Sequence, residues 1–354
     1  MKLKKLHAYQ ILDSRGNPTV AIDATGENKA VSFAVPSGAS TGKHEAIELR
    51  DGGKDYHGLG VQKAVNNVNN ILDKAVSELD ITDQKKLDQR LVELDGTENK
   101  AKLGANAILA VSAVAARLAA SELGIPLYRY LKVLYDHDSK YQVEKEAKGQ
   151  FTLPKMFFNI LNGGEHADNR LDFQETMIVP QRETVAENLQ LASEVYHTLK
   201  KILKTKGLST GLGDEGGFAP DLESNSKALE LITEAIKEGG YQPGKDIAIA
   251  LDVAANSLVE SENIGQYRLA SEEISLSAVQ LVSYYKDLLA NYPIVSIEDG
   301  LSEDDWAGWQ MMTERLGDQV ELVGDDIFVT NPHLIEKGIK EKVANSVLIK
   351  INQI

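Results

Sequence analysis

Four ionisable residues stand at the ends of short apolar segments in the second half of the sequence. Asp252 ends IAIALD, Glu298 ends PIVSIE, Asp325 ends ELVGD and Lys350 ends SVLIK. Each segment has the length of a strand, and the residues between successive segments leave room for a helical crossover. The C-terminal ends of parallel strands meet at one face of a sheet or barrel. We therefore expect the three carboxylates and the amine to share a small volume.

Three neighbouring carboxylates cannot all ionise without a compensating cation. Mg²⁺ is the natural candidate, because it binds carboxylate oxygens and keeps other positions for water or substrate oxygens. Beside a metal and partly desolvated, Lys350 would have a lowered pKa and could accept a proton near neutral pH. Two plainer interpretations stay open. The acids can cap the helices that follow them, and the lysine can be an ion-pair partner of Asp325 or Glu298.

A glycine-rich segment, GLGDEG at 211–216, matches the spacing of a dinucleotide-binding loop. In such a loop a helix begins at once, so that its N-terminus meets the pyrophosphate, whereas Gly217 and Pro220 interrupt any helix here. Asp214 and Glu215 would also repel phosphate groups. We therefore predict an acidic active-site loop, with Glu215 as a candidate general acid.

Two further segments carry groups that could bind a ligand. SGASTGK at 37–43 lacks the glycine spacing of a phosphate-binding loop, but it could fold over a site and offer Ser40 oxygens to a metal. Taken by itself, the segment favours a plain turn over such a loop. NGGEHADNRLDFQET at 162–176 brings His166, Gln174 and Glu175 into one loop and the strand after it. This grouping favours a functional role over a purely structural histidine.

The composition limits the classes of function. A net charge of −15 argues against nucleic-acid binding, because the phosphate backbone would be repelled. A small anionic substrate is compatible with this charge if a metal or a few lysine and arginine side chains supply local positive charge. The sequence contains no cysteine, which excludes disulfides, thiolate nucleophiles and cysteine-based zinc sites.

The sequence also favours a cytoplasmic protein with no membrane span. The N-terminus, MKLKKLHAYQILDSRGNP, has basic residues but no apolar core of signal-peptide length. The most membrane-like stretch is 105–125, where Asn106, Arg117 and many alanines fit a buried helix better than a span.

The pattern along the chain predicts an α/β protein of two domains. Residues 1–134 begin with short strands separated by turn residues and continue with helical periodicity, which indicates an α+β domain. The polar stretch 135–150 is the expected linker. In residues 151–354, apolar strands alternate with amphipathic helices, which predicts a parallel sheet, either open or closed into a barrel.

At this level of detail the sequence resembles the enolase family. The resemblance spans the whole chain, and it implies an N-terminal α+β capping domain followed by a modified eight-stranded TIM barrel. The stretches that carry it are DSRGNPTV at 13–20, VPSGASTGKHEA at 35–46, NGGEHADN at 162–169, GDEGGFAP at 213–220, SIEDGL at 296–301, VGDDIFVTN at 323–331 and IKINQI at 349–354.

The resemblance implies phosphopyruvate hydratase activity, the reversible dehydration of 2-phosphoglycerate to phosphoenolpyruvate in glycolysis. It implies two Mg²⁺ ions, the first held by Asp252, Glu298 and Asp325 and the second reached by Ser40. A lysine base working beside magnesium is an established pattern of the enolase superfamily, and Lys350 matches that base, which would remove the C2 proton.

The resemblance also implies the remaining roles at the substrate. Glu215 matches the acid that protonates the departing C3 hydroxyl. His166, Gln174 and Glu175 match residues around the substrate and its leaving water. The family is usually dimeric and in some bacteria octameric, so a homodimer or octamer is expected. Nothing in the sequence decides whether the protein also occurs at a cell surface.

Some features depart from the family pattern. DVAANS at 252–257 replaces the usual Asp-Cys-Ala-Ala-Ser-Glu run, and Thr176 replaces a phenylalanine. The family continues beyond IKINQI with a helix, an eighth strand and a final helical region that help bind the phosphate. We therefore expect a barrel truncated after its seventh strand, and little or no turnover from these 354 residues alone.

Three interpretations of this ending stay open. The favoured one is a fragment of an ordinary enzyme. The second is a truncated, non-catalytic copy that acts as a binding or interaction protein. The third is another acid dehydratase of the enolase superfamily.

Overall fold

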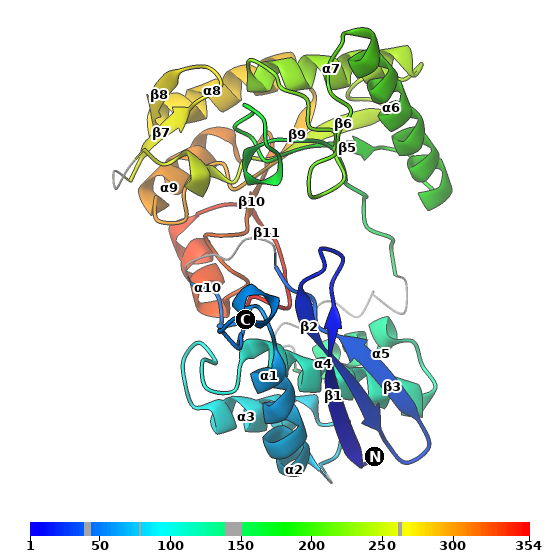
Figure 1. Ribbon diagram of the computed structural model, residues 1–354. Coiled ribbons are helices and arrows are strands. Elements are labelled where there is room, and N and C mark those ends of the chain that lie inside the picture. Colours follow the sequence, from blue (N-terminus) through cyan, green and yellow to red (C-terminus); the bar gives the residue numbers. More distant parts are fainter. Residues whose placement is uncertain (39–43, 78, 139–150, 261–263) are drawn as a thin grey trace. The chain divides into compact units, whose positions relative to one another are not determined.

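The computed structural model describes residues 1–38, 44–77, 79–138, 151–260 and 264–354 (Figure 1). The chain divides into two compact units, residues 1–150 with 350–354, and residues 151–349. Each unit has its own hydrophobic core. Residues 139–150, most of the expected linker, lie outside the described residues.

The first unit combines a small sheet with helices, as the strand-then-helix pattern predicted. Its strands β1 (Lys5–Leu12), β2 (Pro18–Thr25) and β3 (Ala30–Ala34) form an antiparallel sheet in that order. The helices that follow are η1 (Asp55–Gly58), α1 (Gln62–Asn67), η2 (Val68–Leu72), α2 (Asp73–Val76), α3 (Gln84–Asp95), α4 (Ala105–Leu123) and α5 (Leu127–Asp138).

Helix α4 is the centre of the core of the first unit. Val111, Val114 and Leu118 are fully buried there. By length and hydropathy it could also cross a membrane, and it is the one helix in the described residues that meets this test. Asn106 is buried as well, and its side-chain amide exchanges two hydrogen bonds with the backbone of Leu49. Its polar group is therefore satisfied inside the unit, as expected for a core helix.

The second unit is built on a six-stranded sheet in the order β11-β10-β9-β6-β5-β4. The strands are β4 (Phe158–Asn162), β5 (Glu175–Pro180), β6 (Ile247–Asp252), β9 (Ile294–Glu298), β10 (Glu321–Gly324) and β11 (Ser346–Val347). Beyond β4, Phe218 adds one parallel bridge to Leu161. A separate hairpin of β7 (Gln266–Leu269) and β8 (Ile274–Ser277) was not predicted from the sequence.

The prediction of a wholly parallel sheet is wrong for β4 and β5. β6, β9, β10 and β11 are mutually parallel, but β5 runs antiparallel to both β4 and β6. The reason lies in the connections. Only the short turn η3 (Gly164–His166) separates β4 from β5, whereas two helices, α6 (Val185–Thr205) and α7 (Asn225–Glu238), separate β5 from β6. Two helices bring the chain back to the end it left, while single helices give the parallel crossovers.

Single helices connect the parallel strands. These are α8 (Ala278–Asn291) before β9, α9 (Trp306–Leu316) before β10 and α10 (Pro332–Glu341) before β11. Thr184 and Glu187 form a capping box on α6, and Pro332 opens α10 behind its cap Asn331. These caps satisfy N–H groups at the start of each helix, which fixes where each helix begins.

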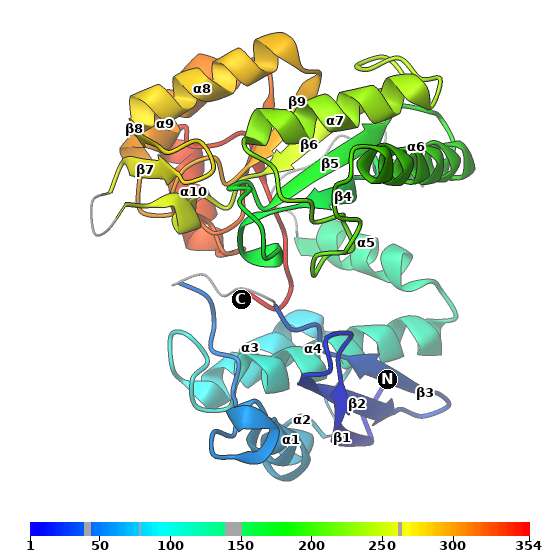
Figure 2. The ribbon, with the colours of Figure 1, turned by 45° about the horizontal axis from the view of Figure 1, so that its top comes forward.

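The two faces of the sheet differ in character. On one face, Ile178, Ile249 and Leu251 belong to the large core, which includes buried residues of α6, α7 and α8; Figure 2 shows α7 and α8 running over the sheet. On the other face, Met177, Val179, Ala248 and Ala250 form a small separate cluster. Alternate residues of a strand point to opposite faces, so the ends of β5 and β6 present Glu175 and Asp252 on the face of the small cluster.

Candidate functional site

The strand register brings acidic residues side by side at one edge of the sheet. Glu175 at the start of β5 is paired with Asp252 at the end of β6, and Asp252 is paired with Glu298 at the end of β9. Neighbouring strands lie roughly 4.8 Å apart, and paired residues share a face. Glu298 is paired with Val323, two residues before Asp325, so Asp325 extends the same row. The carboxylates predicted to converge therefore do share one face.

Asp252 is the most constrained member of this row. It is 7% exposed, and its carboxylate accepts hydrogen bonds from Gln174 Nε2 (2.9 Å) and from the Ala254 N–H (3.0 Å). Burial, together with the charges of Glu175 and Asp325, raises the pKa of Asp252 to about 7, although the Gln174 hydrogen bond opposes the shift. Burial and the neighbouring negative charges therefore make ionisation of Asp252 unfavourable.

Two acids that were not predicted lie close to Asp325. Ligand atoms of Asp299, Asp325 and Asp326 come within 4.8 Å of one another. Burial and the neighbouring charges of Asp326, Asp252 and Asp325 raise the pKa of Asp299 well above its ordinary value. The signal that could have found both acids is their position, since each one immediately follows a predicted ligand, in IED and in GDD.

The donor chemistry of this edge fits Mg²⁺, which prefers carboxylate oxygens and would favour the charged forms of Asp252 and Asp299. Among the described residues, however, the oxygens of Asp252, Glu298 and Asp325 do not all fall within 4.8 Å of one another, although those of the Asp299 group do. The three predicted ligands share one face without forming a closed triad. Their assignment as metal ligands stays a prediction.

A second group lies beside Asp252. His166, Glu175 and Glu215 also have ligand atoms within 4.8 Å of one another. His166 is 8% exposed, and its Nδ1 lies 3.5 Å from Glu175 Oε1, which is long for a hydrogen bond but close enough for charge attraction. The interaction with Glu175 is the main cause that raises the pKa of His166. The structure thus brings together three residues predicted from two separate segments.

The loop that carries Glu215 is held by its backbone. Asp214 N–H donates to the His166 carbonyl oxygen (3.0 Å), and Gly217 N–H donates to Asn162 Oδ1 (2.9 Å). Gly216 has a φ of +83°, a conformation that favours glycine. Phe218 then pairs with β4 instead of starting a helix. GLGDEG therefore lacks the helix that a dinucleotide-binding loop requires, and Glu215 is left exposed beside His166.

Two predicted residues are not placed with this site. Ser40 lies outside the described residues. Lys350 belongs to the compact unit formed with residues 1–150, so its position relative to the carboxylates is not defined. The expected strand through Lys350 is shorter than predicted, because β11 ends at Val347 and Ile349 is 60% exposed. The roles of Ser40 and Lys350 stay predictions.

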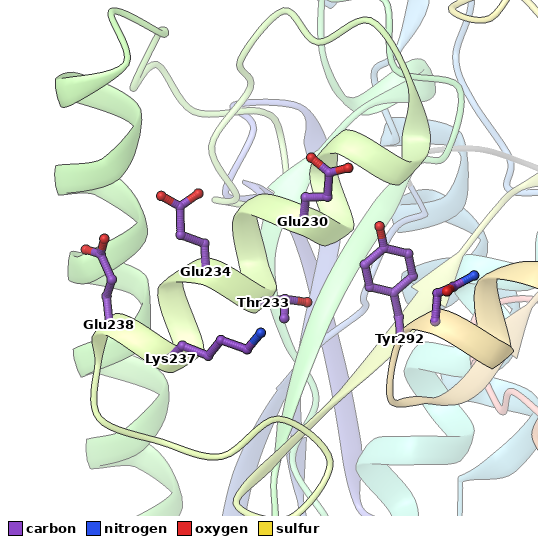
Figure 3. A pocket seen from close by; sticks show the side chains of 7 residues that line it. Glu230, Thr233, Glu234, Lys237, Glu238 and Tyr292 are labelled. Carbon is purple, nitrogen blue, oxygen red and sulfur yellow. The ribbon is translucent and has the colours of Figure 1, made fainter.

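A surface cavity of about 430 Å³ lies elsewhere in the second unit (Figure 3). Its lining comprises Glu230, Thr233, Glu234, Lys237, Glu238, Asn291 and Tyr292. These residues lie in α7 and at the end of α8, just before β9 begins, whereas Glu298 lies where β9 ends. Three glutamates against one lysine would repel an anionic ligand. This cavity therefore does not suit the chemistry of the carboxylate row.

Comparison with known proteins agrees with the motifs. The family description "Enolase, N-terminal domain" matches residues 3–131, and "Enolase, C-terminal TIM barrel domain" matches residues 150–354. The chain belongs to the enolase family. A curated enolase from Sulfurimonas denitrificans is 52% identical over 356 residues, covering 100% of this chain and 80% of that protein. The predicted family, its two-domain α/β fold and its enzyme class, a phosphopyruvate hydratase, are confirmed.

Proposed function

We propose that this enolase-family chain carries out reversible dehydration of 2-phosphoglycerate to phosphoenolpyruvate, the glycolytic step, with Mg²⁺. The observation that carries the proposal is the row of Glu175, Asp252, Glu298 and Asp325 at adjacent strand ends. A single acid at a strand end is common. Three paired acids, with a fourth just beyond the next strand, at the end of the sheet where barrel enzymes bind substrate support a cation-assisted reaction.

The proposed chemistry begins with a proton beside a carboxylate, which is only weakly acidic. Lys350 accepts this C2 proton and leaves a doubly charged ene-diolate. Asp252, Glu298 and Asp325 would hold one Mg²⁺ ion and Ser40 would reach a second, and this metal would supply positive charge where negative charge develops on the substrate.

Elimination is then completed at C3, where Glu215 donates a proton to the departing hydroxyl. His166 and Glu175, which lie beside Glu215, position the leaving water. Gln174 holds Asp252 in place through its amide. The roles of Glu215, His166 and Glu175 come from the family resemblance and are supported by the grouping of their side chains. The resemblance also places Gln174 beside the substrate.

The assay follows ultraviolet absorbance as phosphoenolpyruvate forms from 2-phosphoglycerate. We expect Mg²⁺-dependent turnover that EDTA abolishes. Glu215→Gln should lower turnover by about 100-fold or more, while the exposed Glu223→Gln in the same unit serves as the matched control.

Other outcomes identify the alternatives. A folded protein without turnover would reject the proposal and favour a non-catalytic binding protein. Turnover of a different carboxylic acid would favour another dehydratase of the superfamily. We further propose a cytoplasmic homodimer or octamer with no nucleic-acid partner, which sedimentation and cell fractionation would test.

A further inference from the structure

Asp299 joins three strand ends in the second unit. Its N–H donates to the Val323 carbonyl oxygen on β10 (3.0 Å), and its own carbonyl oxygen accepts from the Ala255 N–H (3.0 Å), just beyond β6. Its φ is +42°, which residues other than glycine rarely adopt. Such a conformation persists only where the surroundings impose it, and it is common at functional sites.

The side chain of Asp299 acts on the neighbouring strand end. Oδ1 accepts from the Asp325 N–H (3.0 Å), and Oδ2 accepts from the Asp326 N–H (2.9 Å). The residue is 4% exposed. Both carboxylate oxygens are therefore engaged in fixing the backbone of the two acids that follow β10. Asn256 Nδ2 adds a second restraint by donating to Asp326 Oδ2 (2.9 Å).

We propose that Asp299 is a positioning residue that sets the direction of the Asp325 carboxylate for Mg²⁺. This inference rests on the proposed function of the same site. A carboxylate side chain leaves Cα in a direction set by its own backbone, so the two N–H bonds fix where Asp325 can point. Partners that orient a metal ligand in this way commonly matter nearly as much as the ligand itself.

Two substitutions separate position from charge. Asp299→Asn keeps the shape, but it removes a charge and turns an NH₂ group toward a backbone N–H. Asp299→Glu keeps the charge, but its extra methylene prevents the carboxylate from meeting both N–H groups. Calorimetric titration of the 354-residue chain with MgCl₂, without substrate, measures binding directly. We expect both variants to bind Mg²⁺ about tenfold or more weakly.

The matched control is Asp95 in the first unit. It is 2% exposed, and its two oxygens accept from the N–H groups of Thr97 (3.0 Å) and Leu103 (2.6 Å). Asp95→Asn and Asp95→Glu should lower the melting temperature comparably and leave Mg²⁺ affinity near that of the wild type.

Three results would overturn the inference. The first is wild-type Mg²⁺ affinity in Asp299→Glu, which would mean that only the charge matters. The second is an equal loss of Mg²⁺ affinity in the Asp95 variants, which would indicate general destabilisation. The third is no Mg²⁺ binding by the wild type. Unchanged Mg²⁺ affinity in both Asp299 variants of a protein that turns over 2-phosphoglycerate would reject this inference alone. Absence of turnover in the wild-type protein would instead reject the proposed function.

Discussion

Two neighbouring strand ends each carry a pair of consecutive acids. In the first pair, the two acids have different roles. Glu298 lies in the carboxylate row, while Asp299 bonds to the backbone of the next strand end. The sequence predicted the first member and missed the second. Adjacent residues leave a strand in different directions, and only the turn geometry determines that Asp299 faces N–H groups. Spacing alone carries no information about that turn.

The pairing of His166 with Glu175 makes a prediction about pH. Glu175→Gln removes the carboxylate that raises the pKa of His166, so that pKa should fall. In the wild type the attraction stabilises the fold fully below the unfolded-state histidine pKa and is lost as pH rises through the raised value. The stability difference between wild type and variant should therefore be greatest at low pH within this window.

Nuclear magnetic resonance titration of the imidazole C–H signals would measure this shift, with the other histidines as internal references. Glu165→Gln, an exposed neighbour, is the control and should leave the His166 titration unchanged. An unaltered midpoint in Glu175→Gln would contradict the pairing.

At the scale of elements, the sequence was most informative where local chemistry decides the structure. It located β6, β9 and β10, the strands whose ends carry the predicted carboxylates. It did not predict the direction of β5, because strand direction depends on how many helices intervene and on which edge the chain meets. It also missed the β7–β8 hairpin, whose strands are only four residues each. Short elements of this kind carry little periodic signal.

Helix α6 offers a test of local stability. Thr184 accepts from the Glu187 N–H, and the Glu187 side chain accepts from the Thr184 N–H. Thr184→Ala should lower the free energy of unfolding by about 1 kcal/mol, because N–H groups at the helix start lose their partner. Urea denaturation measures this change. Thr198→Ala, inside the same helix, removes only a bond to the Glu194 carbonyl and should cost less. Equal losses would show that the cap has no special role.

At the scale of the whole molecule, the net charge of −15 affects which ions approach the site. An acidic chain attracts divalent cations and repels anions, so a cation bound at the carboxylate row would also favour the approach of an anionic substrate. Negative charge is concentrated at the carboxylate row and at the neighbouring Asp299, as the raised pKa values of Asp252 and Asp299 indicate.

Thermal unfolding with and without Mg²⁺ tests this view. The pKa of Asp252 is raised from 3.8 to about 7, so its contribution to stability is present below pH 3.8 and is lost as pH rises through about 7. A bound cation would restore the stability that is lost when Asp252 ionises. We therefore expect a larger rise in melting temperature on adding MgCl₂ at about pH 8 than at about pH 6. An equal rise at both values, or the same rise with NaCl of matched ionic strength, would contradict it.

The two helices between β5 and β6 determine which residues lie at the acidic end of the sheet. β5 begins at the same end of the sheet at which β6 ends. Glu175 is therefore the first residue of its strand, and its partner Asp252 is the last residue of the neighbouring strand. Removing one whole helix would reverse the polarity of β5 and carry Glu175 to the far rim. Because the number of helices between β5 and β6 is even, the imidazole of His166 stays within reach of the acids. No single side chain encodes this number.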